Sequence, residues 1–188
     1  MNTVSLHYIA CAIQFATAQY TYVALKARAY IFKAEPTISV PYYVTGVLDF
    51  IQDGNFLRVN GSVSGLSAGL HGFHVHEKGD IGDACKDAGP HYNPFYMDHG
   101  GPIFLPRHTG DFGNIMASNS GIATINEIFA ATSLLPPYSI IGRAIVVHAM
   151  RDDLGFGNGP TSKTTGESGE RVACGIIGVE VTPSRKLP

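Results

Sequence analysis

Glycine and proline divide this chain into short segments that alternate between apolar and polar residues or are rich in β-branched and aromatic ones. Segments of this kind are expected at 27–34, 43–52, 56–66, 71–77, 111–117, 121–128, 142–150 and 171–181. Short strands separated by turn residues at such spacing are typical of antiparallel sandwiches and barrels. The sequence therefore predicts an all-β fold, an eight-stranded antiparallel Greek-key barrel or sandwich.

Two connections are much longer than the others, at about 77–110 and 151–170. Connections longer than about 15 residues are uncommon inside a compact domain and usually carry function. We therefore expect the functional residues of this chain to lie in or beside these two loops.

The bulk properties favour one globular domain. The 188 residues are 45% hydrophobic, which is enough to bury a sizeable core. The net charge is −2 and basic residues form no long run, which argues against nucleic acid as a main partner.

The first 25 residues differ from the rest because they contain no Lys, Arg, Asp or Glu. An apolar stretch is followed by Ala16-Thr17-Ala18, small residues at the spacing of a signal-peptidase site. We expect residues 1–18 to be a signal peptide and residues 19–188 to form a single domain. An uncleaved membrane anchor and an added strand or disordered arm are the alternatives.

Two further features favour export over a cytoplasmic or membrane-anchored location. Removal of the leader also removes Cys11 and leaves an even pair, Cys85 and Cys174. Asn60 begins an Asn-Gly-Ser sequon, which marks it as a candidate glycosylation site. We therefore expect the protein to be secreted.

His74 and His76 lie two residues apart in a segment with strand-like alternation, "GFHVHEKGD". Residues i and i+2 of a strand point to the same face, so the two imidazole rings emerge together. Neighbouring imidazoles repel each other when protonated and pack less well than aliphatic side chains. A shared metal ion, the commonest partner of neutral imidazole, explains the pair.

Four more histidines extend this pattern. His91, His99 and His108 lie in the first long connection, close to Asp111, and His148 ends the apolar run "AIVVH", where a core position would favour an aliphatic residue. A lone histidine is best interpreted as a hydrogen-bonded surface or core residue, but a cluster is not. Imidazoles with a single carboxylate suit zinc, copper or iron.

Several motifs together closely resemble the copper/zinc superoxide dismutase family, in its secreted form. They are "GLHGFHVHEKGD", "AGPHYNP", "HGGP", "RHTGDFGN", "IIGRAIVVHAMRDDLG" and "GESGERVACGIIG". They occur in the family's order and spacing between about residues 26 and 181. The resemblance implies an enzyme that dismutates the superoxide anion to dioxygen and hydrogen peroxide, with copper and zinc ions as cofactors.

The resemblance also implies roles for individual residues. Copper would be bound by His74, His76, His91 and His148, and zinc by His91, His99, His108 and Asp111. His91 would bridge the two ions and act in catalysis by taking up and returning a proton. Asp152 would hydrogen-bond one copper histidine and one zinc histidine.

Two further assignments follow from the resemblance. Arg171 would be the catalytic arginine that attracts superoxide and hydrogen-bonds to it. Cys85 and Cys174 would form a disulfide, with free buried thiols as the alternative.

Three positions depart from the family pattern. The segment "GNGPTSKTTG" has no acidic residue and carries Lys163 one place early, and Met150 stands where the family often has a lysine. We therefore expect weaker electrostatic steering. A homodimer is expected, although Lys78 replaces an aromatic residue of many dimeric members. Its apolar surface would map to Ala29, Ile31, Gly79, Ile141, Gly142, Ile176 and Val179.

A copper-loading chaperone is a further expected partner. A non-enzymatic copper-delivery protein is disfavoured because the chain has no C-x-x-C pair and keeps all four copper-site histidines. His99, His108 and Asp111 argue against a copper-only enzyme, and Arg171 beside a full copper set argues against a purely structural sandwich.

Overall fold

A computed structural model of the chain describes residues 25–35 and 43–180. The expected signal peptide, residues 1–18, and Cys11 lie outside the described residues. Within the described ranges, no helix is both long enough and apolar enough to span a lipid bilayer.

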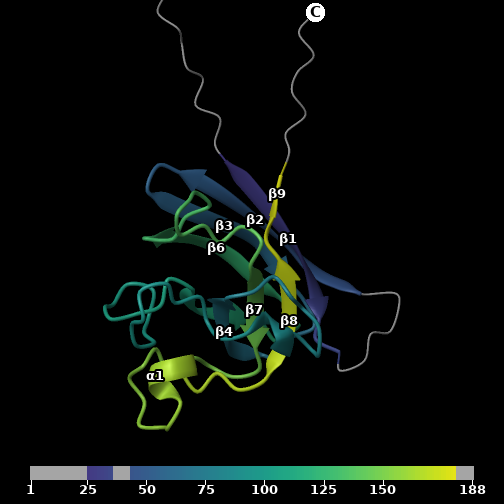
Figure 1. The fold of residues 1–188 in the computed structure, drawn as a ribbon. Coiled ribbons are helices and arrows are strands. Elements are labelled where there is room, and N and C mark those ends of the chain that lie inside the picture. The colour runs from purple at the N-terminus through teal and green to yellow at the C-terminus, as the bar shows by residue number, and fades with distance from the viewer. Residues whose placement is uncertain (1–24, 36–42, 181–188) are drawn as a thin grey trace, which may run out of the picture.

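Nine antiparallel strands and two very short helices make up the described chain (Figure 1). The strands are β1 Lys26–Lys33, β2 Val44–Asp53, β3 Phe56–Val63, β4 Gly69–Val75, β5 Asp111–Ala117, β6 Ala123–Ala130, β7 Ala144–His148, β8 Arg171–Ile176 and β9 Gly178–Val179. The first long connection contains the 3-10 helix η1 Lys86–Ala88, and the second contains the helix α1 Ser162–Thr165.

The strands close into a barrel. Hydrogen-bonded neighbours follow the order β2-β3-β6-β5-β4-β7-β8-β1, and β1 pairs again with β2. The neighbours β3–β6 and β4–β7 are not consecutive in sequence, which is the Greek-key arrangement. The predicted eight-stranded antiparallel Greek-key barrel with two long loops is therefore confirmed.

The last predicted strand, 171–181, is wrong as one continuous element. It breaks at Ile177, which separates β8 from β9. The Ile177 N–H donates to the Arg143 carbonyl at 2.9 Å, and the Ile177 carbonyl accepts from Gly142 at 2.8 Å. These bonds draw the backbone away from β1, so β9 pairs with β1 separately, at Ala27 and Arg28. The other predicted strand ends agree with the structure to within three residues.

The barrel interior is filled by the inward side chains of every major strand. On β1 these are Ala27, Ala29 and Ile31, each fully buried. Because side chains alternate between the two faces of β1, Ala29 and Ile31 point into the barrel and cannot contact a partner molecule. The prediction that they lie on a dimer surface is therefore wrong. Tyr30, between them, is 51% exposed.

One side of the barrel is covered a second time, by the two long connections. On β7, Ile145 and Val147 face the interior, whereas Ala144 and Val146 join an outer cluster with Cys85 and Cys174. Strands β4 and β7 are consequently buried on both faces. Side chains that leave the barrel here enter a second interior rather than water.

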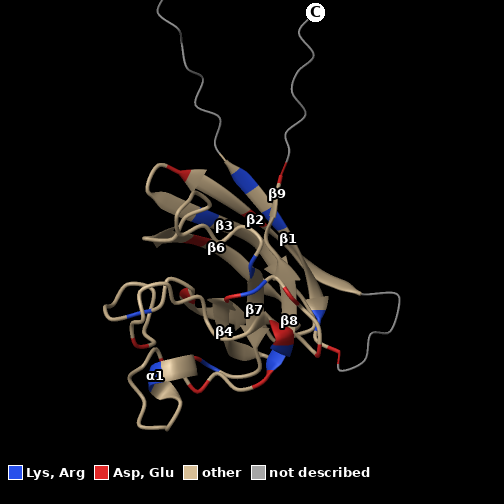
Figure 2. Cartoon of the chain, in the orientation of Figure 1, with Lys and Arg blue, Asp and Glu red and all other residues tan. Residues whose placement is uncertain are grey.

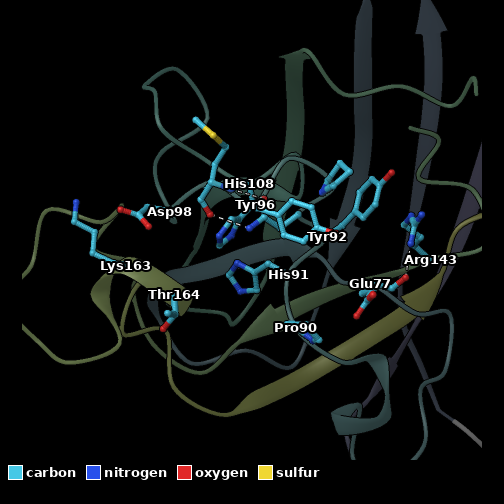
Figure 3. A pocket seen from close by; sticks show the side chains of 13 residues that line it. Glu77, Pro90, His91, Tyr92, Tyr96, Asp98, His108, Arg143, Lys163 and Thr164 are labelled. Carbon is cyan, nitrogen blue, oxygen red and sulfur yellow. Dashed lines mark hydrogen bonds between the residues drawn. The ribbon is translucent and has the colours of Figure 1, made fainter. Parts of the chain in front are cut away.

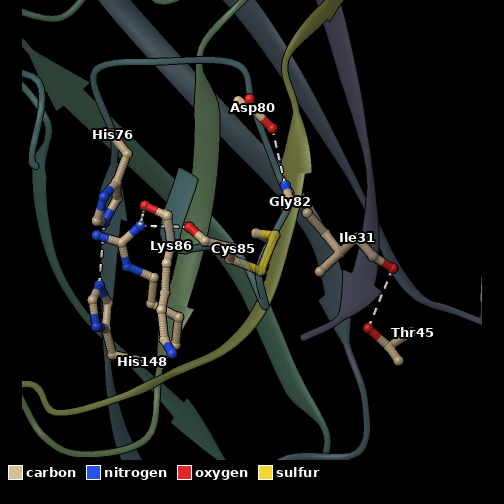
Figure 4. Close-up of a disulfide and its surroundings, with 10 residues drawn as sticks. Ile31, Thr45, His76, Asp80, Gly82, Cys85, Lys86 and His148 are labelled. Atoms are coloured by element: carbon tan, nitrogen blue, oxygen red, sulfur yellow. Dashed lines mark hydrogen bonds between the residues drawn. A yellow bond between two sulfur atoms is a disulfide. The ribbon is translucent and has the colours of Figure 1, made fainter. Parts of the chain in front are cut away.

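A disulfide fixes this covering layer to the barrel, as the family resemblance implied (Figure 4). Cys85, beside η1, bonds to Cys174 on β8 across 89 residues of sequence, with the two Cα atoms 6.2 Å apart. In the chain-entropy model, closing a loop of this length lowers the conformational entropy of the unfolded chain, which stabilises the folded protein by about 4–5 kcal/mol.

Replacing both cysteines, Cys85→Ser with Cys174→Ser, is expected to lower the free energy of unfolding by about 2–5 kcal/mol, because the unfolded chain regains its conformational entropy. Denaturant unfolding of the oxidised protein and of the double variant, both metal-free, measures the difference. Chemical reduction of the parent protein provides the control and should reproduce the loss. Equal midpoints in all three samples would contradict the expectation.

Candidate metal centre

Six histidines and two aspartates meet beneath the covering layer. Strand β4 supplies His74, and the residue after its end is His76, whose backbone bridges that of His91. Strand β7 ends at His148, and β5 begins at Asp111. The first connection adds His99 and His108, and the second adds Asp152. All eight residues are at most 6% exposed: His74, His76, His91, His99, His108, Asp111, His148 and Asp152.

The structure brings His74, His76, His91 and His148 into one group. The outer nitrogens of three rings are already hydrogen-bonded: His74 Nε2 to Asp152 Oδ2 at 2.8 Å, His76 Nδ1 to the Gly89 carbonyl at 2.8 Å, and His148 Nδ1 to the Gly169 carbonyl at 3.1 Å. This leaves His74 Nδ1 and Nε2 of His76 and His148 for a common partner. The last two nitrogens are 3.3 Å apart, and Figure 4 shows their rings turned toward each other.

A second group consists of His91, His99, His108 and Asp111. Nδ1 of the three rings lies 2.9, 3.0 and 3.1 Å, respectively, from one atom, Asp111 Oδ1. The other carboxylate oxygen, Oδ2, accepts from the backbone N–H groups of Gly100 at 3.0 Å and His108 at 2.7 Å, which fixes its orientation. Ligand atoms of a tetrahedral zinc ion lie about 3.3 Å apart, close to these separations.

His91 and Asp152 connect the two groups. His91 belongs to both, with Nδ1 toward Asp111 and Nε2 toward the other histidines. Asp152 binds His74 through Oδ2 and His99 through Oδ1, each at 2.8 Å. The ring orientations of both groups are therefore set by shared residues.

The donor atoms fit metal ions. His74 Nδ1, His91 Nε2 and His99 Nδ1 are buried and have no hydrogen-bond partner. Buried polar atoms without partners are costly, and one cation in each group would satisfy all three. Three imidazoles with one carboxylate make a closed four-ligand site of the kind zinc occupies, and four imidazole nitrogens suit copper.

Burial sets the protonation of the first group. Removal from water lowers the pKa of His74, His76 and His91, and lowers that of His148 to about 3. At neutral pH these rings are therefore uncharged, the form that binds metals.

In the second group, neighbouring charges outweigh burial in setting the pKa values. Burial alone would lower the pKa of His99, but the two neighbouring carboxylates, Asp111 and Asp152, outweigh burial and raise the pKa to about 9, with His99 Nε2 donating to Asp152. Burial would raise the pKa of Asp111, yet hydrogen bonds with His108 and His91 and the proximity of the His99 ring hold it well below its usual range. Asp111 is therefore the anionic centre of this group.

Arg171 lies at the rim of the first group. Its guanidinium donates to the carbonyls of Cys85, of Lys86 at 3.1 Å and of Gly89 at 2.6 Å. Burial lowers its pKa, from an ordinary value high enough that the group stays charged at neutral pH. Together with His76, His91 and His148 it lines a cavity of about 280 Å³, hereafter the copper-side cavity.

A separate cavity of about 530 Å³ opens beside the second group (Figure 3). His91 and His108 lie at its floor, and Lys163 and Asp98 on its wall. Lys163 therefore borders this zinc-side cavity, and it is not among the residues that line the copper-side cavity.

Three supporting residues were not assigned a role from the sequence. Arg107, nearly buried, donates to the carbonyls of His108 at 2.8 Å and Ala130 at 2.9 Å. Asn114 holds the backbone of Asp152 through two hydrogen bonds, of 2.7 and 2.9 Å. His71 Nδ1 lies 2.7 Å from the His148 carbonyl. Arg107 and Asn114 both belong to "RHTGDFGN", which was the available signal.

The barrel with two adjoining imidazole sites defines a protein built to hold two metal ions. A model of the family described as copper/zinc superoxide dismutase matches residues 44–177. The chain belongs to this family.

Similar proteins agree with this assignment. A protein of Caenorhabditis elegans named extracellular Cu-Zn superoxide dismutase is 54% identical over 154 residues, covering 82% of this chain and 69% of that protein. One of the same name from Haemonchus contortus is 48% identical over 179 residues, covering 95% and 92%. Superoxide dismutase Cu-Zn 2 of Mesembryanthemum crystallinum is 45% identical over 153 residues, covering 81% and 98%.

The metal-free protein is expected to lose stability as the pH falls from about 6.5 toward about 3. His148 has a lower pKa folded than unfolded, so the unfolded chain binds more protons in this range, and each such ring contributes up to about 1.4 kcal/mol per pH unit. His74, His76 and His91 act in the same direction.

His99 acts in the opposite direction, but its contribution is complete below its unfolded value and is lost only as the pH rises through about 9. Denaturant unfolding of the metal-free protein at several pH values measures the slope. His148→Gln, which removes one titrating ring, should reduce that slope. A stability independent of pH in this range would contradict the account.

Proposed function

We propose that this chain converts superoxide to dioxygen and hydrogen peroxide at a copper site joined to a zinc site through His91. Family membership supplies the substrate and the two metals. The observation that carries the residue assignment is the position of His91, whose ring belongs to both donor groups and whose buried Nε2 has no partner.

In this proposal copper is held by His74, His76, His91 and His148. Copper supplies the one-electron oxidation and reduction that dismutation requires, whereas zinc has no redox chemistry. The strands β4 and β7 hold His74 and His148 on a rigid barrel, and the bonds to Asp152, Gly89 and Gly169 keep the inner nitrogens turned toward the site.

In this proposal zinc would be held by His91, His99, His108 and Asp111. Four protein donors would close the site, so zinc would have a structural role and would tie the first connection to β5. The negative charge of Asp111 would offset part of the ion's charge. Asp152 bonds to both His99 and His74, so the orientations of these two rings depend on each other.

His91 and Arg171 act on the substrate side. His91 lines the copper-side cavity. Its Nε2 can take up a proton there and return it to the peroxide product. Arg171 presents a fixed cation to an anionic substrate, because three carbonyls of the first connection hold its guanidinium in place.

We also propose a homodimer. Ile176 and Val179 are 43% and 51% exposed, Gly142 is exposed and Ile141 is half-buried. This apolar surface, with Tyr30 in place of Ala29 and Ile31, would pair with the same surface of a second copy. Lys78 is exposed there and can keep its charge in water. Analytical ultracentrifugation tests this proposal: Ile176→Glu should yield monomer, and a monomeric parent protein would refute it.

Secretion is proposed with cleavage after residue 18. The extracellular names of two relatives and the disulfide support it. N-terminal sequencing of protein from a secreting host tests it, and an intact residue 1 would refute cleavage. Asn60 lies in β3 with a half-buried side chain, and its glycosylation stays a prediction for mass analysis of the same protein. A copper-loading chaperone is proposed because the copper histidines are at most 3% exposed.

Two variants are expected to separate metal binding from substrate guidance. His148→Ala should lose bound copper and with it nearly all superoxide turnover. Arg171→Ala should keep both metals and slow turnover by about tenfold or more, since the cation no longer attracts the anion. Metal analysis and superoxide decay on the same samples measure both quantities. Full activity in a copper-loaded His148→Ala protein would contradict the assignment.

The rate is expected to depend only weakly on salt. The copper-side cavity carries one cation, Arg171, and one carboxylate, Glu167, and Lys163 borders the other cavity. Figure 2 shows Lys and Arg interspersed with Asp and Glu rather than forming one basic face. We expect kcat/KM to fall by less than about threefold between low and physiological ionic strength. A tenfold fall, measured by superoxide decay, would contradict this.

A further inference from the structure

Met150 lines the copper-side cavity together with His76, His148 and Arg171. It is 57% exposed, so the side chain is open to solvent and to small solutes in the cavity. Its backbone is anchored on both sides: its N–H donates to the Ser168 carbonyl at 2.9 Å, and its carbonyl accepts from Gly72 at 2.8 Å. Met150 is thus a fixed part of the wall.

The sulfur atom itself lies close to the copper group. A Cβ atom added at Gly169 would come within 3.0 Å of Met150 Sδ, so the sulfur rests against this glycine. The Gly169 carbonyl in turn accepts the hydrogen bond from His148 Nδ1 at 3.1 Å. One residue therefore separates the thioether from a copper-site ring.

Met150 is also the most easily oxidised side chain of the wall. Among the described residues that line the cavity, it is the one that carries sulfur; the others are His76, Pro90, His91, His148, Thr161, Thr165, Glu167, Gly169 and Arg171. A thioether is oxidised to a sulfoxide by peroxide, and the change converts a flexible apolar side chain into a polar one.

We propose that Met150 is a modification site, oxidised to methionine sulfoxide by hydrogen peroxide formed in the copper-side cavity. The inference rests on the proposed function, which makes peroxide at this place. A sulfur lone pair forms the S–O bond while the peroxide O–O bond breaks, and a proton passes to the departing oxygen, which leaves as water. The sulfur is oxidised by two electrons and the peroxide is reduced by two.

Met116 provides a matched comparison within the chain. It is 59% exposed, almost the same as Met150, but it lies on β5 and is not among the residues that line the copper-side cavity. Exposure alone therefore predicts equal oxidation of the two residues. Met97, 41% exposed on the zinc-side cavity, is a second comparison.

The experiment follows sulfoxide formation at each methionine by peptide mass spectrometry. The full chain, loaded with copper and zinc, receives either a steady supply of superoxide or added hydrogen peroxide, and metal-free protein receives the same peroxide. Copper, when bound beside this wall, supplies the activation that favours reaction there. We expect at least about fivefold more sulfoxide at Met150 than at Met116 in the loaded protein, and a ratio near one in the metal-free protein.

The outcomes distinguish this inference from the proposed function. Equal oxidation of Met150 and Met116 in loaded protein that consumes superoxide overturns the inference alone. Loaded protein that does not consume superoxide overturns the proposed function, and the samples given peroxide still decide whether Met150 is selectively oxidised. Met150→Leu should abolish the oxygen gain in its peptide, and a gain that persists there would place the oxidation at another residue and refute the assignment.

Discussion

The burial of six imidazole rings and two carboxylates in one cluster is the constraint on which the rest of this structure depends. Taking such polar groups out of water is costly unless each finds a partner. Hydrogen bonds satisfy the outer nitrogens, but three inner nitrogens face one another or a carboxylate without a bond. Bound cations resolve this cost, so the cluster is stable as a metal centre and poorly suited to be an ordinary core.

The covering layer, formed by the two long connections, encloses this cluster. The disulfide ties the first connection to β8, and this places the Gly89 carbonyl where it accepts from both His76 and Arg171. One loop thus orients both His76, the proposed copper ligand, and Arg171, the proposed substrate-guiding cation. The second connection contributes Asp152, which is held by Asn114 and spans both donor groups. Loss of either connection would expose the site and misplace its ligands.

Strand periodicity predicted the most regular part of the site from residues alone. The alternation around His74 and His76 placed both rings on one face of a strand, and the structure shows that face to be opposite the inward Phe73 and Val75. His91, His99 and His108 lie in a loop, where no period fixes direction, so their assignment to a copper set and a zinc set rested on the family resemblance. The break at Ile177 depends on hydrogen bonds from a distant turn, which sequence does not reveal.

The complete second group also argues against the copper-only alternative.

The central claim is that the ring of His91 is shared by two different ions. Crystal diffraction of the metal-loaded protein, recorded at the copper and zinc absorption edges, tests it most directly. The account predicts a copper peak beside Nε2 and a zinc peak beside Nδ1 of His91, about 6 Å apart given metal–nitrogen bonds near 2 Å. A single peak, or two ions with His91 bound to neither or to only one of them in every oxidation state, would contradict it.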